Sequence, residues 1–260
     1  MNLAARIRDQ RVAPGSLAIF WIAQAGFVYK TPNDQVIYID PYLTDAVARR
    51  LGDVLYGFKR LTPSLIAPAE VEADLVVTTH EHLDHFDADA MPILARNPRT
   101  RFVGAPDCQA RFAEAGIAAE RVTILCAGET AHFEGFSLTG AYADHGDLAP
   151  EAIGIILQAG DLRIWQVGDS AYRPDRWQDI CAQGVDVLIT PINGAFGNMN
   201  GVEAAHLARA CRARVAIPCH FWMFAEHNGD PARFLEAMRE HAPATTAHLM
   251  AQGECLMIGE

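Results

Sequence analysis

The segment Thr79–His85 (THEHLDH) carries the side chains best suited to chemistry, namely His80, His82, Asp84 and His85. In an extended chain His80 and His82 share one face and can converge on one ion, whereas Asp84 and His85 can reach a second. Neutral imidazole binds zinc, manganese or iron, and a carboxylate adds a hard oxygen ligand. The spacing predicts a metal site; a polar loop with chance histidines is the alternative.

Further ligands are expected at the ends of later strands, because one cluster cannot complete two coordination shells. His145, Asp169 and His220 each follow an apolar run that reads as a strand, and Asp169 is suited to bridge two cations. Taken singly, Asp169 also fits a turn, and each histidine fits a hydrogen bond to the backbone. Their shared placement after apolar strands favours metal binding.

Three other residues are predicted to support the metal site or to bind substrate. Asp40 is placed to accept a hydrogen bond from a ligand histidine, with a turn carboxylate as the alternative. Asn193 and His227 lie in polar loops and are predicted to bind substrate.

Two further groups have equally open interpretations. Phe221, Trp222 and Phe224 form either an apolar wall beside the site or ordinary core. The basic pairs at 49–50 and 59–60 either bind a phosphate or are solvated.

The composition excludes several classes of protein. Half of the 260 residues are apolar and a fifth are charged, as in a packed globular protein. With 21 Lys and Arg against 32 Asp and Glu, the net charge of −11 argues against nucleic acid or an anionic membrane as partner. No apolar stretch approaches the roughly twenty residues of a membrane helix. The composition is compatible with an enzyme that acts on a small molecule.

The N-terminus and the cysteines favour a cytoplasmic protein. Residues 1–29 partly resemble a secretory signal, but Asp9 and Pro14 interrupt it, so this segment is predicted to belong to the mature protein. The six cysteines form no CxxC pair, which predicts free thiols in a reducing compartment.

Hairpins are expected to open each half of the chain and β–α alternation to close it. Strands are expected over residues 16–21, 26–30, 36–40, 74–79, 101–104, 121–125, 132–141, 153–157, 162–167, 185–190 and 215–218, with a final hairpin over 245–258. Helices are expected over residues 87–95, 107–115, 174–183, 201–212 and 231–241, while residues 42–70 read as irregular. This order predicts an α+β fold with two mixed sheets face to face and helices outside, an αββα sandwich, as a single domain over residues 1–260.

The segment from His80 to His85 resembles the HxHxDH motif of the metallo-β-lactamase superfamily. The later candidates His145, Asp169 and His220 follow the ligand order of that family. The resemblance implies a metallo-β-lactamase-like sandwich and two divalent ions. It assigns His80, His82 and His145 to one ion and Asp84, His85 and His220 to the other, with Asp169 bridging them.

Within that superfamily the chain is similar to the L-ascorbate-6-phosphate lactonases. The similarity lies in the segments Ile39–Pro41, Gly168–Tyr172 and Ile217–His220. It implies manganese and a phosphorylated sugar lactone. The segment 191–200 (PINGAFGNMN) departs from the corresponding loop of those lactonases, and Ala171 replaces a histidine.

We therefore expect a hydrolase with two manganese or zinc ions, whose bridging hydroxide opens a small anionic sugar-derived lactone. Asp84 is expected to orient the hydroxide or carry a proton. The expected partner is a small molecule, not nucleic acid or a membrane, and a homo-oligomer is left open. The alternatives are a small-molecule phosphodiesterase on the same core and a non-catalytic metal-binding sensor or scaffold.

Overall fold

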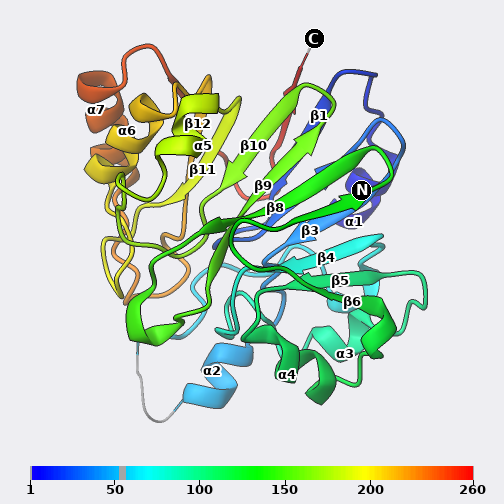
Figure 1. The fold of residues 1–260 in the computed structure, drawn as a ribbon. Helices are drawn as coiled ribbons and strands as arrows, with labels where there is room; N and C mark the ends of the chain where they lie inside the picture. The colour runs from blue at the N-terminus through cyan, green and yellow to red at the C-terminus, as the bar shows by residue number, and fades with distance from the viewer. Residues whose placement is uncertain (1, 53–56, 260) are drawn as a thin grey trace. The chain divides into compact units, whose positions relative to one another are not determined.

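The computed structural model describes residues 2–52 and 57–259 and contains two compact units (Figure 1). The first unit comprises residues 1–125, 223–225 and 251–260, and the second comprises residues 126–222 and 226–250. Each unit is built on one seven-stranded mixed sheet, with helices packed on it. The predicted α+β class, with two mixed sheets flanked by helices, is confirmed.

The sheet of the first unit has the order β14-β1-β2-β3-β4-β5-β6. Its strands are β1 (Leu17–Trp21), β2 (Phe27–Lys30), β3 (Val36–Ile39), β4 (Leu75–Thr78), β5 (Arg101–Gly104), β6 (Val122–Ile124) and β14 (Cys255–Ile258). Strands β14 to β3 pair antiparallel, and β3 to β6 pair parallel. The carboxyl ends of the parallel strands therefore share one edge of this sheet.

The sheet of the second unit repeats this plan, with the order β13-β12-β11-β10-β9-β8-β7. Its strands are β7 (Thr130–Phe133), β8 (Phe136–Tyr142), β9 (Ile153–Ala159), β10 (Leu162–Gln166), β11 (Val187–Pro191), β12 (Val215–Cys219) and β13 (Thr246–Ala247). Strands β7 to β10 form an antiparallel meander, and β10 to β13 pair parallel. Strands β8, β10, β11 and β12 consequently run in one direction and end at one edge.

Short helices connect these strands. The α-helices are α1 (Leu3–Asp9), α2 (Ala46–Leu51), α3 (Met91–Leu94), α4 (Cys108–Glu114), α5 (Gln178–Gln183), α6 (Gly201–Ala210) and α7 (Pro231–His241). Single 3₁₀ turns span Pro68–Glu70, Ala119–Arg121 and Gly146–Leu148. The two longest helices, α6 and α7, lie beside each other in the second unit (Figure 1). Each begins at a side-chain cap, Asn200 for α6 and Asp230 for α7, as expected for these residue types.

Several predicted elements differ from the structure. The expected hairpin over 245–258 is wrong, because β13 pairs with β12 in the second sheet while β14 pairs with β1 in the first. The strand expected over 132–141 is a hairpin of β7 and β8, which turns at Gly135 with a positive φ of 82°. The helix expected over 87–95 is shorter in the structure, where α3 spans Met91–Leu94. Residues 42–70 contain α2 and a 3₁₀ turn, and positions 53–56 of that segment lie outside the described residues.

The cysteine prediction is wrong for one pair. Cys181 in α5 forms a disulfide with Cys211, which directly follows α6. The ends of the two helices lie together, since the Val185 N–H donates to the Cys211 carbonyl at 3.3 Å. A sequence separation of 30 residues gives no signal for such a pair. The cysteines at positions 108, 126 and 255 are free thiols.

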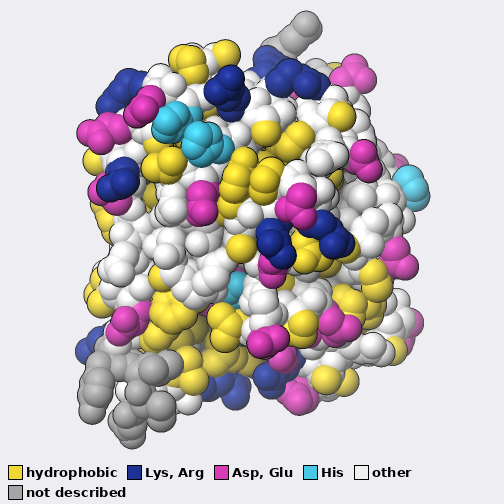
Figure 2. All heavy atoms as spheres, turned by 60° about the vertical axis from the view of Figure 1, so that its left-hand side comes forward, with side chains coloured by type: hydrophobic (Ala, Val, Ile, Leu, Met, Phe, Trp, Pro, Cys, Tyr) yellow, Lys and Arg dark blue, Asp and Glu magenta, His cyan; other side chains and the backbone are white. Residues whose placement is uncertain are grey.

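Two further sequence-based expectations concern the whole chain. Among the described residues, no helix is both long and apolar enough to cross a membrane. On the face drawn in Figure 2, basic side chains lie next to acidic ones. The assignment of residues 1–260 to a single domain stays a prediction.

Replacement of Phe112 by alanine is expected to destabilise the first unit by about 3–5 kcal/mol. The Phe112 ring is buried, and its centroid lies 5.1 Å from that of Phe86 and 5.9 Å from that of Phe102. Gly104 makes room for it, because a Cβ there would lie 2.6 Å from the Phe112 ring. Urea unfolding measures the loss. Phe112→Leu, which keeps most of the volume, is the control and should lose about 1 kcal/mol; equal losses in both variants would contradict the packing argument.

Candidate metal centre

Strand β4 presents the first group of candidate ligands, here called the first ligand cluster: His80, His82, Asp84 and His85. The strand is buried along its length, and the chain leaves the sheet directly after it. The ring centroid of His80 lies 4.5 Å from that of His82 and 4.1 Å from that of His85. His80 Nε2 is 2.9 Å from His82 Nδ1, and Asp84 Oδ2 is 3.7 Å from His85 Nε2. The structure therefore brings these four predicted ligands together in the first unit.

Asp40 anchors this cluster from the neighbouring strand. It follows β3 at the same sheet edge, is fully buried, and has a positive φ of 50°. Its carboxylate accepts hydrogen bonds from Thr79 N and Thr79 Oγ1, both at 2.8 Å, and lies 2.9 Å from His85 Nδ1. A carboxylate in this position holds the proton on Nδ1 and directs the Nε2 lone pair of His85 toward a ligand.

The sequence analysis missed Gln24, which contacts Asp84. Gln24 Nε2 donates a hydrogen bond to Asp84 Oδ2 at 2.8 Å. Gln24 is fully buried, and both Ala23 and Gln24 have positive φ values, 84° and 53°. A positive φ is energetically unfavourable for a non-glycine residue, so two such residues in succession strain the backbone. Backbone strain of this kind is concentrated at functional sites. The only signal in the sequence was a polar residue within an otherwise apolar stretch.

Replacement of Gln24 by alanine is expected to lower kcat/KM about 10–100-fold, the usual effect of losing a supporting contact to a ligand. The reason is that the Asp84 carboxylate loses the donor that fixes its orientation. The measurement is the pH profile of kcat/KM together with the metal content. Gln109→Ala, at an exposed position of α4, is the control. A Gln24→Ala enzyme with an unchanged profile would refute the positioning role.

The second unit carries a second ligand cluster: His145, Asp169, His220 and His227. The first three follow β8, β10 and β12, whose carboxyl ends share one edge of the sheet. Asp169 Oδ2 lies 3.8 Å from His145 Nε2 and 3.2 Å from His220 Nε2. All four side chains are almost completely buried. One carboxylate oxygen thus faces two imidazole nitrogens, an arrangement suited to a cation.

The segment after β11 supports this cluster, and Asn198 is the residue in it that the sequence analysis missed. Asn198 Nδ2 donates to Asp169 Oδ2 at 2.8 Å. Asn193, the predicted substrate-binding residue, is buried and donates from Nδ2 to the Ala195 carbonyl at 3.1 Å. Its amide nitrogen therefore stabilises its own loop. Sequence position alone did not distinguish the two asparagines.

His227 and the predicted aromatic wall divide between core and surface. His227 is 5% exposed, and its ring stacks on that of His220 with centroids 4.4 Å apart. Phe221 and Phe224 are buried core residues, whereas Trp222 is 59% exposed. Of the three aromatic residues suggested for an apolar wall, Trp222 is thus the one accessible to a substrate.

The donors in both clusters fit a divalent metal. Imidazole nitrogens and carboxylate oxygens are the ligand set of zinc, manganese and iron sites. The ligand atoms of His80 and His85 lie within 4.8 Å of one another, as do those of His220 and His227. Buried imidazoles gathered at such distances can bind one cation together as neutral ligands.

Three of the four basic residues suggested for phosphate binding, the arginines, make contacts elsewhere in the first unit. Arg49 and Arg50 both pair with Asp89, at 2.5 and 3.1 Å. Arg60 stacks on Tyr42 and donates to the carbonyls of Tyr42, Thr44 and Thr62.

Burial shifts the pKa values of the two side chains that stack in this contact, Arg60 and Tyr42. Burial lowers the pKa of Arg60. It also raises the pKa of Tyr42, against the opposing effect of Arg60 and with the help of Asp84, so the phenol stays protonated.

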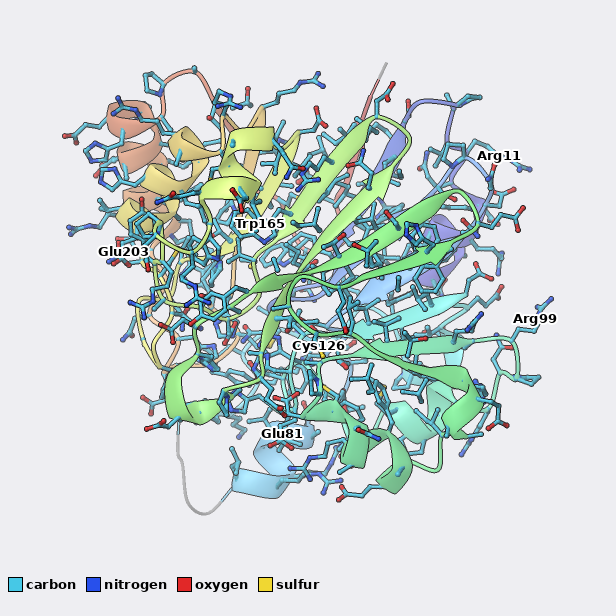
Figure 3. The ribbon with its side chains drawn as sticks, viewed as in Figure 1. Arg11, Glu81, Arg99, Cys126, Trp165 and Glu203 are labelled. Carbon is cyan, nitrogen blue, oxygen red and sulfur yellow. A yellow bond between two sulfur atoms is a disulfide. The ribbon has the colours of Figure 1, made fainter. Side chains whose placement is uncertain are left out.

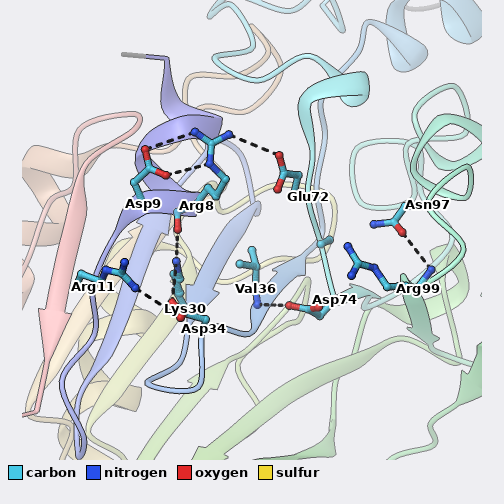
Figure 4. A pocket seen from close by; sticks show the side chains of 11 residues that line it. Arg8, Asp9, Arg11, Lys30, Asp34, Val36, Glu72, Asp74, Asn97 and Arg99 are labelled. Carbon is cyan, nitrogen blue, oxygen red and sulfur yellow. Dashed lines mark hydrogen bonds and ion pairs between the residues drawn. The ribbon is translucent and has the colours of Figure 1, made fainter.

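A cavity of about 530 Å³ on the first unit is lined by none of the candidate metal ligands (Figure 4). Its charged lining residues are Arg8, Asp9, Arg11, Lys30, Asp34, Glu72, Asp74 and Arg99. Arg8 pairs with Asp9 and Glu72, and Asp34 pairs with Arg11 and Lys30. Four acidic side chains balance four basic ones, which indicates a structural network of ion pairs.

Fold and ligand sets together define a metal-dependent hydrolase of the metallo-β-lactamase superfamily. The Beta-lactamase superfamily domain matches residues 18–220, so the chain belongs to that superfamily. Its family is that of the UPF0173 metal-dependent hydrolases. A member from Aeropyrum pernix is 30% identical over 206 residues, covering 74% of this chain and 84% of the relative. A member from Rubrobacter xylanophilus is 28% identical and covers 92% of this chain and 96% of the relative.

Solved structures share the fold. The isothiocyanate hydrolase from Delia radicum gut bacteria superposes with a TM-score of 0.76 at 18% identity, covering 93% of this chain and 99% of that one. A metallo hydrolase from the archaeon Ignicoccus hospitalis gives a TM-score of 0.73 at 20% identity, with 94% and 99% covered.

Proposed function

We propose that the protein is a dinuclear metal-dependent hydrolase that opens a small lactone with a water-derived nucleophile. The observation that carries this proposal is the second ligand cluster, in which the Nε2 atoms of His145 and His220 lie 3.8 and 3.2 Å from one oxygen of Asp169. A buried carboxylate close to two imidazoles supports a role as a metal ligand together with them.

The proposed ligands come from both units. They are His80, His82, Asp84 and His85 of the first unit and His145, Asp169 and His220 of the second. Their order along the chain, together with membership of the superfamily, supports their assignment as ligands of manganese or zinc ions.

Two divalent ions held in this way would lower the pKa of a water molecule and polarise the lactone carbonyl. The protein's own residues position the reactants. Gln24 orients Asp84, which is proposed to orient the water or take up its proton. Asp40 holds His85 in the tautomer that presents Nε2. Water adds across the acyl C–O bond, which breaks to give a hydroxy acid.

The lactone assignment is supported by the resemblance to L-ascorbate-6-phosphate lactonases. The phosphate of their substrate has less support, because Arg49, Arg50 and Arg60 make the intramolecular contacts described above. We therefore propose that the substrate is a lactone or related ester without a phosphate group.

The test is hydrolysis by purified protein loaded with manganese or zinc, measured on a lactone panel and on bis(p-nitrophenyl) phosphate. We expect lactone turnover that a chelator abolishes and that a His82→Ala variant lacks. Phosphodiester turnover without lactone turnover would instead identify a phosphodiesterase. Tight metal binding without any turnover would favour the sensor or scaffold.

A further inference from the structure

The segment 193–200 lies beside the second ligand cluster. A Cβ at Gly197 would lie 3.9 Å from His145 Nδ1, and Asn198 donates to Asp169. The Phe196 ring centroid lies 5.6 Å from that of His227, which stacks on His220. A substrate bound at this cluster therefore meets the segment, and Phe196 is its large apolar side chain.

Hydrogen bonds hold this segment in one conformation. Gly194 N donates to the Met199 carbonyl and Asn198 N to the Ala195 carbonyl, both at 3.0 Å. The segment ends in a capping box, in which Asn200 accepts from the first turn of α6 and Glu203 accepts from Asn200 N (Glu203 is labelled in Figure 3). Phe196 itself has a positive φ of 55°, which is costly for an aromatic residue. A rigid but strained placement of this kind is typical of a binding residue.

Apolar side chains are exposed on three loops that carry the cluster. Phe196 is 43% exposed, Trp222 is 59% exposed, and Leu148 is 54% exposed. Trp222 lies two residues after His220, and Leu148 lies three residues after His145. Large apolar side chains that are exposed on loops beside a candidate site are available for contact with a ligand.

The same loops lack the permanently charged side chains of lysine and arginine. Segments 143–149, 192–200 and 219–222 contain neither lysine nor arginine. Arg173 is already engaged in an ion pair at 2.7 Å with Asp144, which directly precedes His145. Recognition of a carboxylate or phosphate normally uses a guanidinium or ammonium group, so these loops do not favour an anionic substituent.

Resting on the proposed function, we infer that the substrate is an uncharged lactone or ester whose apolar substituent packs on Phe196 and Trp222. This narrows the substrate class and replaces the anionic sugar lactone expected from the sequence. Phe196 is then a residue that determines specificity.

The experiment compares two butyrolactones of equal chain length, one with a hexyl and one with a carboxypentyl substituent. We expect the metal-loaded enzyme to prefer the hexyl lactone at least tenfold in kcat/KM. Phe196→Ala should reduce this preference about tenfold, chiefly through KM. Leu249→Ala, a 40% exposed leucine of the same unit, is the control and should keep the preference. Metal content and urea unfolding verify that each variant is folded.

Binding of the corresponding pyrrolidinones, which resist hydrolysis, separates this inference from the proposed function. Calorimetry should show tighter binding of the hexyl compound and a loss of that difference in Phe196→Ala. If neither lactone is hydrolysed but this difference is found, the hydrolase proposal fails and the inference stands. Equal or stronger binding of the carboxypentyl compound, or no binding of either, overturns the inference whatever the hydrolysis assay gives.

Discussion

Asp169→Asn is expected to lower hydrolytic activity about a thousandfold, the scale of losing a central electrostatic group. The substitution keeps the shape of the side chain but removes the negative charge that faces His145 and His220. It also places an amide opposite Asn198, whose Nδ2 needs an acceptor. We therefore expect metal occupancy to fall as well. The measurement is kcat/KM under excess metal, with metal content by elemental analysis.

A matched control separates the role of this carboxylate from a general effect of charge. Asp161→Asn removes a charge from an exposed turn of the same unit and should leave activity within twofold. Retention of both metal and activity by Asp169→Asn would remove Asp169 from the ligand set.

Asp40→Asn is expected to weaken metal binding by about 10–100-fold. Both carboxylate oxygens of Asp40 accept hydrogen bonds, from Thr79 and from His85. An asparagine offers one acceptor oxygen and turns an NH₂ group toward one of these donors, so the His85 ring loses its fixed tautomer. Competition with a chelator of known affinity measures the change.

Asp87→Asn is the control for this second substitution. Asp87 is as buried as Asp40 and accepts from Leu43 N, Thr44 N and Thr44 Oγ1, but from no histidine in the described contacts. It should therefore lower stability without weakening metal binding more than about threefold. Equal metal affinity in Asp40→Asn and the wild type would show that Asp40 only stabilises its loop.

The alternation of short apolar runs and turn residues was enough to predict most strands and the α+β class. These signals are local: Asp40 follows β3 and His220 follows β12 because a buried strand ends there. The first ligand cluster was predictable for the same reason, since its members lie close together in sequence.

Contacts between distant segments were not predictable. Gln24 reaches Asp84 across 60 residues and Asn198 reaches Asp169 across 29. Amide side chains show no periodicity, and their partners are chosen by tertiary structure. The partners of β13 and β14 were missed for the same reason, because two adjacent short strands can join different sheets.

The pairing of β14 with β1 has a consequence for biosynthesis. Synthesis proceeds from the N-terminus, yet β1 gains its second neighbour only when residues 255–258 have been made. The first unit also needs residues 223–225, whose Phe224 packs on Tyr42. The second unit needs nothing beyond residue 250. The half of the protein that is translated first is thus the half whose sheet is completed last, and the exposed edge of β1 has to be protected until then.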